Sequence, residues 1–178
     1  GEDGGITLSG GEILLQPEFA LEVFKKCKEP GISTCLDTCG APFTRREPWF
    51  SLFNELLEYT DILLVDIKHI NSDEHKLLTG YPNENILDMC EYLSELGKPV
   101  WIRHVLVPGI TDNDKYLKEL GEYIKTLKNV EKVEVLPYHT MGVRKYKEMG
   151  IKYRLEGVEP PTADRIENAE KLLCVDDY

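Results

Sequence analysis

The sequence has no apolar run long enough to cross a membrane, and no stretch has the pattern of a signal peptide. Basic residues are scarce, because 21 Lys and Arg stand against 32 Asp and Glu for a net charge of −11. This balance argues against a nucleic-acid surface, which needs clustered basic side chains. The five cysteines are irregularly spaced, as is typical of reduced proteins rather than disulfide scaffolds. We therefore expect a cytoplasmic protein that binds neither membranes nor nucleic acid.

Hairpin turns are also missing between the apolar runs, which disfavours an antiparallel sheet. Instead, short aliphatic and β-branched runs alternate with amphipathic segments at the spacing of βαβ units. The runs span residues 6–8, 32–36, 62–65, 100–107 and 130–136. We predict one α/β domain over residues 1–178, whose parallel strands form a partial or open barrel, because they are too few to close a barrel of eight.

Helices are predicted between these strands from apolar periodicity, capping residues and stops at glycine or proline. Four of them cover residues 17–28, 48–57, 72–78 and 85–96. A fifth is capped by Thr111 or Asp112 and runs to about Leu127, and a last helix begins at Pro160. In the first helix, Phe19, Val23 and Cys27 are predicted to form the apolar face. The basic segment before Arg154 is expected to be irregular.

Polar residues or glycines follow the strands at their carboxyl ends. In chain order these are the Gly10-Gly11 turn with Glu12, Asp37 with Thr38, Asp66 with Lys68, Arg103, and His139. In parallel α/β folds this edge of the sheet binds ligands, so we predict that these residues share one site.

The residue types limit the ligand of such a site. Arg103 and Lys68 suit a carboxylate or phosphate. Asp37, Thr38 and Asp66 supply hard oxygen ligands for a cation or an ammonium group. The pattern therefore fits a small zwitterion that carries a nucleoside, and it fits a sugar phosphate about as well.

Five motifs, in order and at matching spacings, carry a resemblance to a known family. They are Gly4–Gln16, Cys35-Leu36-Asp37-Thr38, Val65-Asp66-Ile67-Lys68, Trp101–Gly109 and Leu136-Pro137-Tyr138-His139. Together they closely resemble the activating enzymes of pyruvate formate-lyase, which are radical S-adenosylmethionine (SAM) proteins. The resemblance runs over nearly the whole chain.

The resemblance implies a partial (β/α)6 barrel that uses SAM and a [4Fe-4S] cluster. An electron from the cluster would cleave SAM, and the 5′-deoxyadenosyl radical would take a hydrogen atom from a glycine of pyruvate formate-lyase (formate C-acetyltransferase). The protein would position and shield these cofactors. A flavodoxin or ferredoxin would donate the electron.

The resemblance also implies residue roles. Around SAM it places Ser9, Gly10, Gly11, Glu12, Asp66, Lys68, Arg103, Val105 and His139. For a monovalent cation beside the SAM carboxylate it implies Asp37, Thr38, Asp66 and the carbonyl of Leu64.

One departure from the family is that the sequence has no Cys-x3-Cys-x2-Cys, the loop whose thiolates hold the cluster. Cys35 and Cys39 have the first spacing, but no third cysteine follows, and Cys27, Cys90 and Cys174 are expected on helices. We expect a fragment with five of six βα units, which lacks the cluster loop and is inactive alone. Its first strand would then be an unpaired edge that is prone to self-association.

Two other functions, from different classes of protein, remain open. One is a barrel enzyme that holds a divalent metal at Asp37 and Asp66 and acts on a phosphorylated or carboxylated metabolite. The other is a non-catalytic binding module. The basic residues Arg144, Lys145, Lys147, Lys152 and Arg154 are typical of a solvated surface, or they could dock the electron donor or the partner enzyme. His75 is expected to be solvated, and His104 to pack under a helix.

Overall fold

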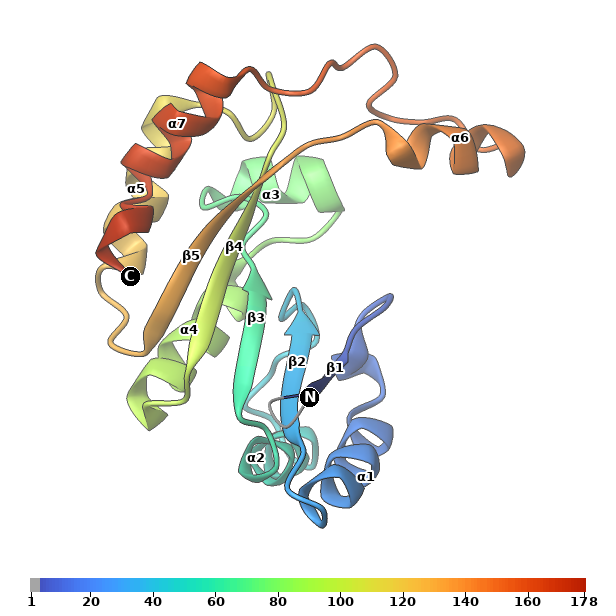
Figure 1. Ribbon diagram of the computed structural model, residues 1–178, viewed down its shortest axis with the longest axis vertical. Coiled ribbons are helices and arrows are strands. Elements are labelled where there is room, and N and C mark those ends of the chain that lie inside the picture. Colours follow the sequence, from blue (N-terminus) through green and yellow to red (C-terminus); the bar gives the residue numbers. More distant parts are fainter. Residues whose placement is uncertain (1–3) are drawn as a thin grey trace.

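A computed structural model describes residues 4–178 and shows one sheet of five parallel strands (Figure 1). The strands are β1 (Gly5–Leu8), β2 (Ser33–Thr38), β3 (Ile62–Asp66), β4 (Val100–Leu106) and β5 (Val130–Pro137), and they pair in chain order. The prediction of a parallel α/β sheet from the apolar runs is confirmed.

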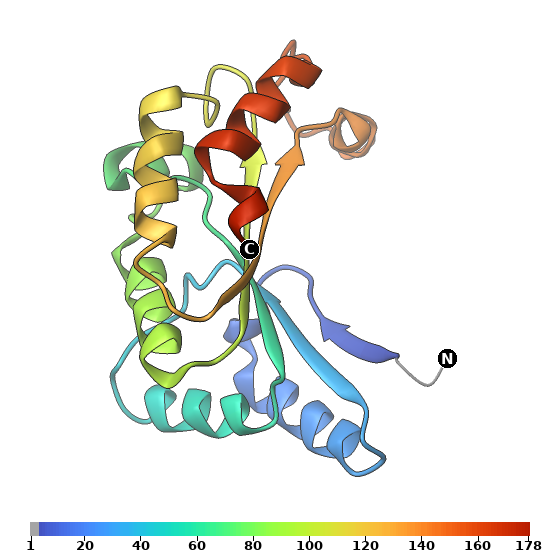
Figure 2. The same ribbon diagram turned by 60° about the vertical axis from the view of Figure 1, so that its left-hand side comes forward.

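Helices follow the strands and, apart from the helix over residues 141–148, cover one face of the sheet (Figure 2). They are α1 (Pro17–Lys28), α2 (Trp49–Glu58), α3 (Ser72–Thr79), α4 (Glu84–Leu96), α5 (Asp114–Ile124), α6 (Met141–Glu148) and α7 (Ala163–Leu172), with 3-10 turns η1 (Ile13–Leu15) and η2 (Val175–Asp177). None of the described helices is long and apolar enough to cross a membrane.

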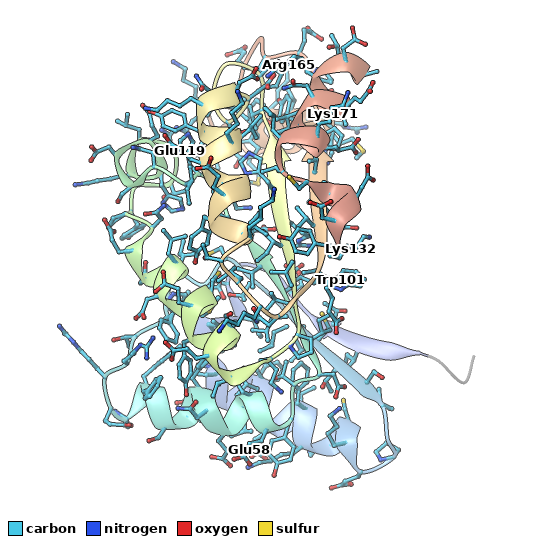
Figure 3. All side chains as sticks on the ribbon, turned by 90° about the vertical axis from the view of Figure 1, so that its left-hand side faces the viewer. Glu58, Trp101, Glu119, Lys132, Arg165 and Lys171 are labelled. Carbon is cyan, nitrogen blue, oxygen red and sulfur yellow. The ribbon has the colours of Figure 1, made fainter. Side chains whose placement is uncertain are left out.

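The core lies between the sheet and these helices, because successive strand residues point to opposite faces. On β4, Ile102 and Leu106 are fully buried under the helices, whereas Trp101 and Arg103 on the other face stay partly exposed. Figure 3 labels Trp101 together with Lys132 of β5, whose ammonium group lies 4.8 Å from the indole ring. This second face, here called the inner face, carries the charged residues of the sheet.

The predicted apolar face of α1 is only partly correct, because Val23 packs against the core but Phe19 does not. The buried residues are Pro17, Ala20, Leu21 and Phe24, whereas 56% of Phe19 is exposed. Both sets of positions have helical spacing, but the buried set includes adjacent positions and makes a wider stripe for β2 and α2.

Helix ends differ from the predictions where several capping residues compete. Asn113 caps α5, and its side chain accepts a hydrogen bond from Lys115 N at 3.0 Å. Thr111 instead donates to the Val105 carbonyl, and Asp112 binds Arg165. The helix α7 begins at Ala163 behind its cap Thr162, later than predicted.

Three further predictions, about residues 141–148, Cys174 and His75, are corrected. Residues 141–148 form α6 although they were expected to be irregular, and Cys174 follows α7 in a left-handed conformation instead of lying on it. His75 is only 3% exposed instead of solvated, and its ring nitrogen Nδ1 lies 2.7 Å from the Tyr81 carbonyl oxygen. His104 is buried as predicted, 2.9 Å from the Ile67 carbonyl.

Candidate functional site

An ion network lies on the inner face at the carboxyl ends of three neighbouring strands. Arg103 on β4 is paired with Asp66 across from it on β3, with Nε 2.9 Å from Oδ1, and with Asp37 on β2. Lys68, two residues beyond Asp66, approaches its other oxygen at 2.6 Å. The sheet register thus brings together four of the residues that the sequence placed in one site.

The network contains two carboxylates and two cationic groups, so its charges balance. Between 16% and 32% of each side chain is exposed, so water still reaches the network. Partly desolvated charges keep their attraction for a charged ligand better than fully exposed ones. A ligand with both charge signs can exchange partners with this network without leaving an ion unpaired.

Glu12 has a different environment, because its own chain already satisfies the carboxylate. It accepts hydrogen bonds from Leu14 N at 2.9 Å, from the Thr38 hydroxyl at 2.5 Å and from Cys39 N at 2.8 Å. These bonds fasten the loop after β1 to the end of β2. Glu12 therefore holds the loop in place, and its carboxylate has little capacity left for a ligand.

The backbone before Glu12 is open to solvent. Ser9, Gly10 and Gly11 are all exposed, and the two glycines have φ of 99° and 53°. A side chain would strain the backbone in this region, so glycine suits the turn. Exposed backbone at this turn can approach a ligand closely.

The thiol of Cys39 shares the Glu12 carboxylate, with Sγ 3.0 Å from Oε2. Burial and this hydrogen bond to a carboxylate raise the pKa of Cys39 to about 11. Because the thiolate is the reactive and metal-binding form, Cys39 is an inert thiol in this setting.

A groove of about 960 Å³ opens beyond the ends of β4 and β5, between α3 and α6. Val105 and His139 line it, as do apolar residues of α3 and the tyrosines 138, 146 and 153. Val105 follows Arg103 by two residues on the same face of β4, so the groove lies next to the ion network, although the four residues of the network do not line it. The structure therefore places charged and apolar parts of the predicted site side by side.

The residues proposed for a cation are only partly brought together. Asp37 lies beside Leu64 in the sheet register, and both Asp37 and Asp66 face Arg103. The Thr38 side chain is buried on the opposite face, where its hydroxyl bonds Glu12 and Gly40 N. The guanidinium of Arg103 already supplies the positive charge between the two carboxylates.

Tyr138 and Tyr153 were missed by the sequence reasoning. Their hydroxyls lie 2.9 Å apart, and Tyr138 is only 7% exposed beside His139. The place of Tyr138 directly after the last strand was a signal, because ligands bind at that edge. Tyr153 had no such sequence signal, because it lines the groove only as a result of how residues 140–158 fold.

An iron–sulfur cluster does not fit the described residues. Within 4–178, no three His, Cys, Asp or Glu side chains come together as metal ligands, and all five cysteines are free. Burial raises the pKa of Cys90 to about 12 and raises that of Cys35, which disfavours both thiolates. The cysteines of this part of the chain therefore do not hold the cluster.

Comparisons with known proteins agree with this geometry. A family profile described as the Radical SAM superfamily matches residues 1–133. The chain is 54% identical over 178 residues to the pyruvate formate-lyase-activating enzyme of Streptococcus mutans and covers 68% of that protein. It is 49% identical over 175 residues to the enzyme of the same name from Listeria monocytogenes and covers 71% of it.

Solved structures show the same fold. A crystal structure of a domain of pyruvate-formate lyase-activating enzyme from Bacteroides vulgatus matches with a TM-score of 0.77 at 27% identity, over 96% of this chain and 93% of that one. A radical SAM methyltransferase from Sphaerobacter thermophilus matches with a TM-score of 0.69 at 20% identity, over 96% of this chain and 48% of that one. The partial-barrel prediction is confirmed, and the chain belongs to the radical SAM superfamily and, within it, to the family of pyruvate formate-lyase-activating enzymes.

Proposed function

We propose that this chain supplies the SAM-binding barrel of an enzyme that activates pyruvate formate-lyase by taking a hydrogen atom from one of its glycines. The observation that carries the proposal is the ion network of Asp37, Asp66, Lys68 and Arg103, which lies next to the groove of Val105 and His139. In a chain of this family, that arrangement fits a zwitterionic nucleoside.

Each part of the site has a chemical task in this proposal. The exposed turn at Ser9, Gly10 and Gly11 offers backbone groups to the amino end of SAM, and Glu12 keeps that turn attached to β2. Lys68 and Arg103 attract the carboxylate and hydroxyl oxygens of SAM. Asp66 holds both cationic side chains in position through its two carboxylate oxygens.

Val105 and His139 would enclose the base of SAM in the groove and exclude water from it. When bound, SAM supplies the 5′-deoxyadenosyl group that takes up the hydrogen atom. The contribution of the chain is therefore binding, orientation and shielding.

The cluster must be held elsewhere in the intact enzyme. We propose that a Cys-x3-Cys-x2-Cys segment precedes Gly1 in the chain and completes the sixth βα unit. The curated relatives are longer than this chain, which covers 68% and 71% of the two compared. The upstream coding sequence tests this directly, and the absence of that cysteine pattern would refute it.

Three narrower proposals follow. A monovalent cation between Asp37 and Asp66 would require Arg103 to move, because its guanidinium now pairs with both carboxylates. A flavodoxin or ferredoxin serves as the electron donor. The free cysteines support a cytoplasmic location.

The β1 strand pairs only with β2 among the described residues, so the isolated chain is expected to self-associate through the open edge of β1. Sedimentation at increasing dilution can test this.

Activation of pyruvate formate-lyase by the intact enzyme tests the function. With SAM and a reductant, electron paramagnetic resonance should detect a glycyl radical on pyruvate formate-lyase, whereas residues 1–178 alone should give none. The metal-enzyme reading predicts turnover of a phosphorylated metabolite with Mg²⁺ and no iron. That result, without any glycyl radical, would overturn the proposal.

A further inference from the structure

The helix α6 and the residues that follow it carry an exposed surface made of Met141, Arg144, Lys147, Met149 and Lys152, here called the α6 surface. Met141 and Met149 are 78% and 53% exposed. Of the eleven large apolar residues that are exposed in the part of the chain that the structure describes, four lie within residues 141–151. Exposed apolar groups concentrated in this way are typical of interaction sites.

The charge of this segment is opposite to that of the rest of the chain. Residues 139–154 contain five basic residues and one acidic residue, a net charge of +4. Because the whole chain has a net charge of −11, the remaining residues carry −15. A partner with an acidic surface would therefore be attracted to this segment and repelled by the rest.

The two sides of α6 have different environments. Gly142 and Tyr146 line the groove, and the Tyr146 ring packs on Tyr153 at 4.9 Å. The other side of α6 carries Arg144 and Lys147, which line a second, shallower hollow together with residues 155–159. Figure 1 shows α6 beyond the end of β5, away from the helices that cover the sheet. Arg144 and Lys147 stay exposed at this hollow and can meet a partner there.

Several contacts fix this segment to the rim of the groove. The Tyr153 hydroxyl bonds that of Tyr138, and the Arg154 guanidinium reaches the carbonyls of Leu77 and Leu78 on α3 at 3.3 and 3.5 Å. Since α6 begins two residues after His139, a macromolecule seated on it is held over the groove.

We propose that the α6 surface docks the protein that carries the substrate glycine, through an acidic patch with apolar neighbours on that protein. This inference rests on the proposed function. An activating enzyme must bring a glycine of a large protein to the mouth of its groove, which α6 borders. An electron donor needs to reach only the cluster, whose ligands are not among residues 4–178.

A double charge reversal in the intact enzyme, Lys147→Glu with Lys152→Glu, tests the proposal. The KM for pyruvate formate-lyase should rise by about tenfold or more, and its dependence on salt should become weaker, because the steering charge is reversed. The kcat, and the rate with a short peptide that contains the glycine, should not change, since a peptide does not reach the α6 surface. The matched control is Lys26→Glu with Lys128→Glu, two exposed lysines far from the groove, and it should leave all four quantities unchanged.

Direct binding separates this proposal from the proposed function. The affinity of the intact enzyme for pyruvate formate-lyase should fall about tenfold in the Lys147→Glu/Lys152→Glu variant and stay constant in the control, whether or not a radical forms. Equal slowing of peptide and protein, a changed KM for the electron donor alone, or unchanged affinity would each overturn the α6 proposal. Absence of any radical with the unmodified enzyme would instead refute the proposed function. Matching circular dichroism spectra and melting temperatures confirm that the variants are folded.

Discussion

The two faces of the sheet divide the tasks of the molecule, as the neighbouring residues Asp37 and Thr38 illustrate. Thr38 points under the helices and fastens Glu12, whereas Asp37 points to the inner face and pairs with Arg103. The face under the helices is buried along β4 and apolar there except for His104, and the inner face is charged and partly open. Stability should therefore depend mainly on the helix-covered face, and ligand binding on the inner face.

Core truncation on the helix-covered face should have the largest effect on stability. Ile102 is completely buried, so Ile102→Ala should reduce the free energy of unfolding by about 2–5 kcal/mol. Val105→Ala on the inner face should cost less than about 1 kcal/mol, because that side chain is already partly in water. Urea unfolding measures both, and equal losses would contradict the division between faces.

The contact between α5 and α7 provides a second test of the packed layer. A Cβ at Gly121 would lie 2.3 Å from the Leu172 carbonyl oxygen, so Gly121→Ala should cost about 1–3 kcal/mol by overpacking. Gly142 of α6 has nothing within 4 Å of such a Cβ, and Gly142→Ala should stabilise by up to about 1 kcal/mol through helix propensity. Melting temperatures that shift in the same direction for both variants would refute this account of the packing.

Removal of the central cation of the network should have a moderate effect on stability. Arg103→Gln leaves Asp37 and Asp66 facing each other without their shared partner, and water screening limits the loss to about 1–2 kcal/mol at pH 7. The loss should shrink at about 1 M salt, because salt screens the repulsion between the two carboxylates. Urea unfolding at low and high salt checks this, and a loss that is independent of salt would mean that the network is not electrostatic.

The smallest effect concerns the reactivity of Cys39. With a pKa of about 11, this thiol is largely protonated at pH 8, and its alkylation by iodoacetamide should speed up about tenfold per pH unit until pH approaches 11. Glu12→Gln removes a carboxylate that raises this pKa, so alkylation at pH 8 should become faster. Mass spectrometry of the Cys39 peptide follows the reaction, and unchanged kinetics in the variant would show that Glu12 does not control the thiol.

The strands were predictable from sequence because each has aliphatic or β-branched residues between signals for turns or helices, and β3 begins with the uninterrupted apolar run Ile62–Val65. The cap of α5 was not, because Thr111, Asp112 and Asn113 are all good caps. Tertiary contacts of Thr111 and Asp112 with distant residues leave Asn113 for the helix. The helix α6 was missed because its sequence has few apolar positions at helical spacing.

The candidate site, like the fold, was predictable from the sequence only in part. The fold class fixes which edge of the sheet gathers the strand ends, so Asp66, Lys68 and Arg103 could be grouped from the sequence alone. The saturation of Glu12 could not be predicted, because its partners Thr38 and Cys39 lie 26 and 27 residues away in the chain. His75 differs in this respect, because its partner, the carbonyl of Tyr81, lies only six residues away in the chain.

Equilibrium binding of SAM to the intact enzyme tests the role of the inner face most directly. Lys68→Met removes a cation of the network at the strand ends, whereas Lys132→Met removes a cation of the same face that stacks on Trp101. We predict about tenfold or weaker binding for Lys68→Met, because a charge-assisted contact is lost, and unchanged binding for Lys132→Met. Equal affinities of the two variants for SAM would contradict the account.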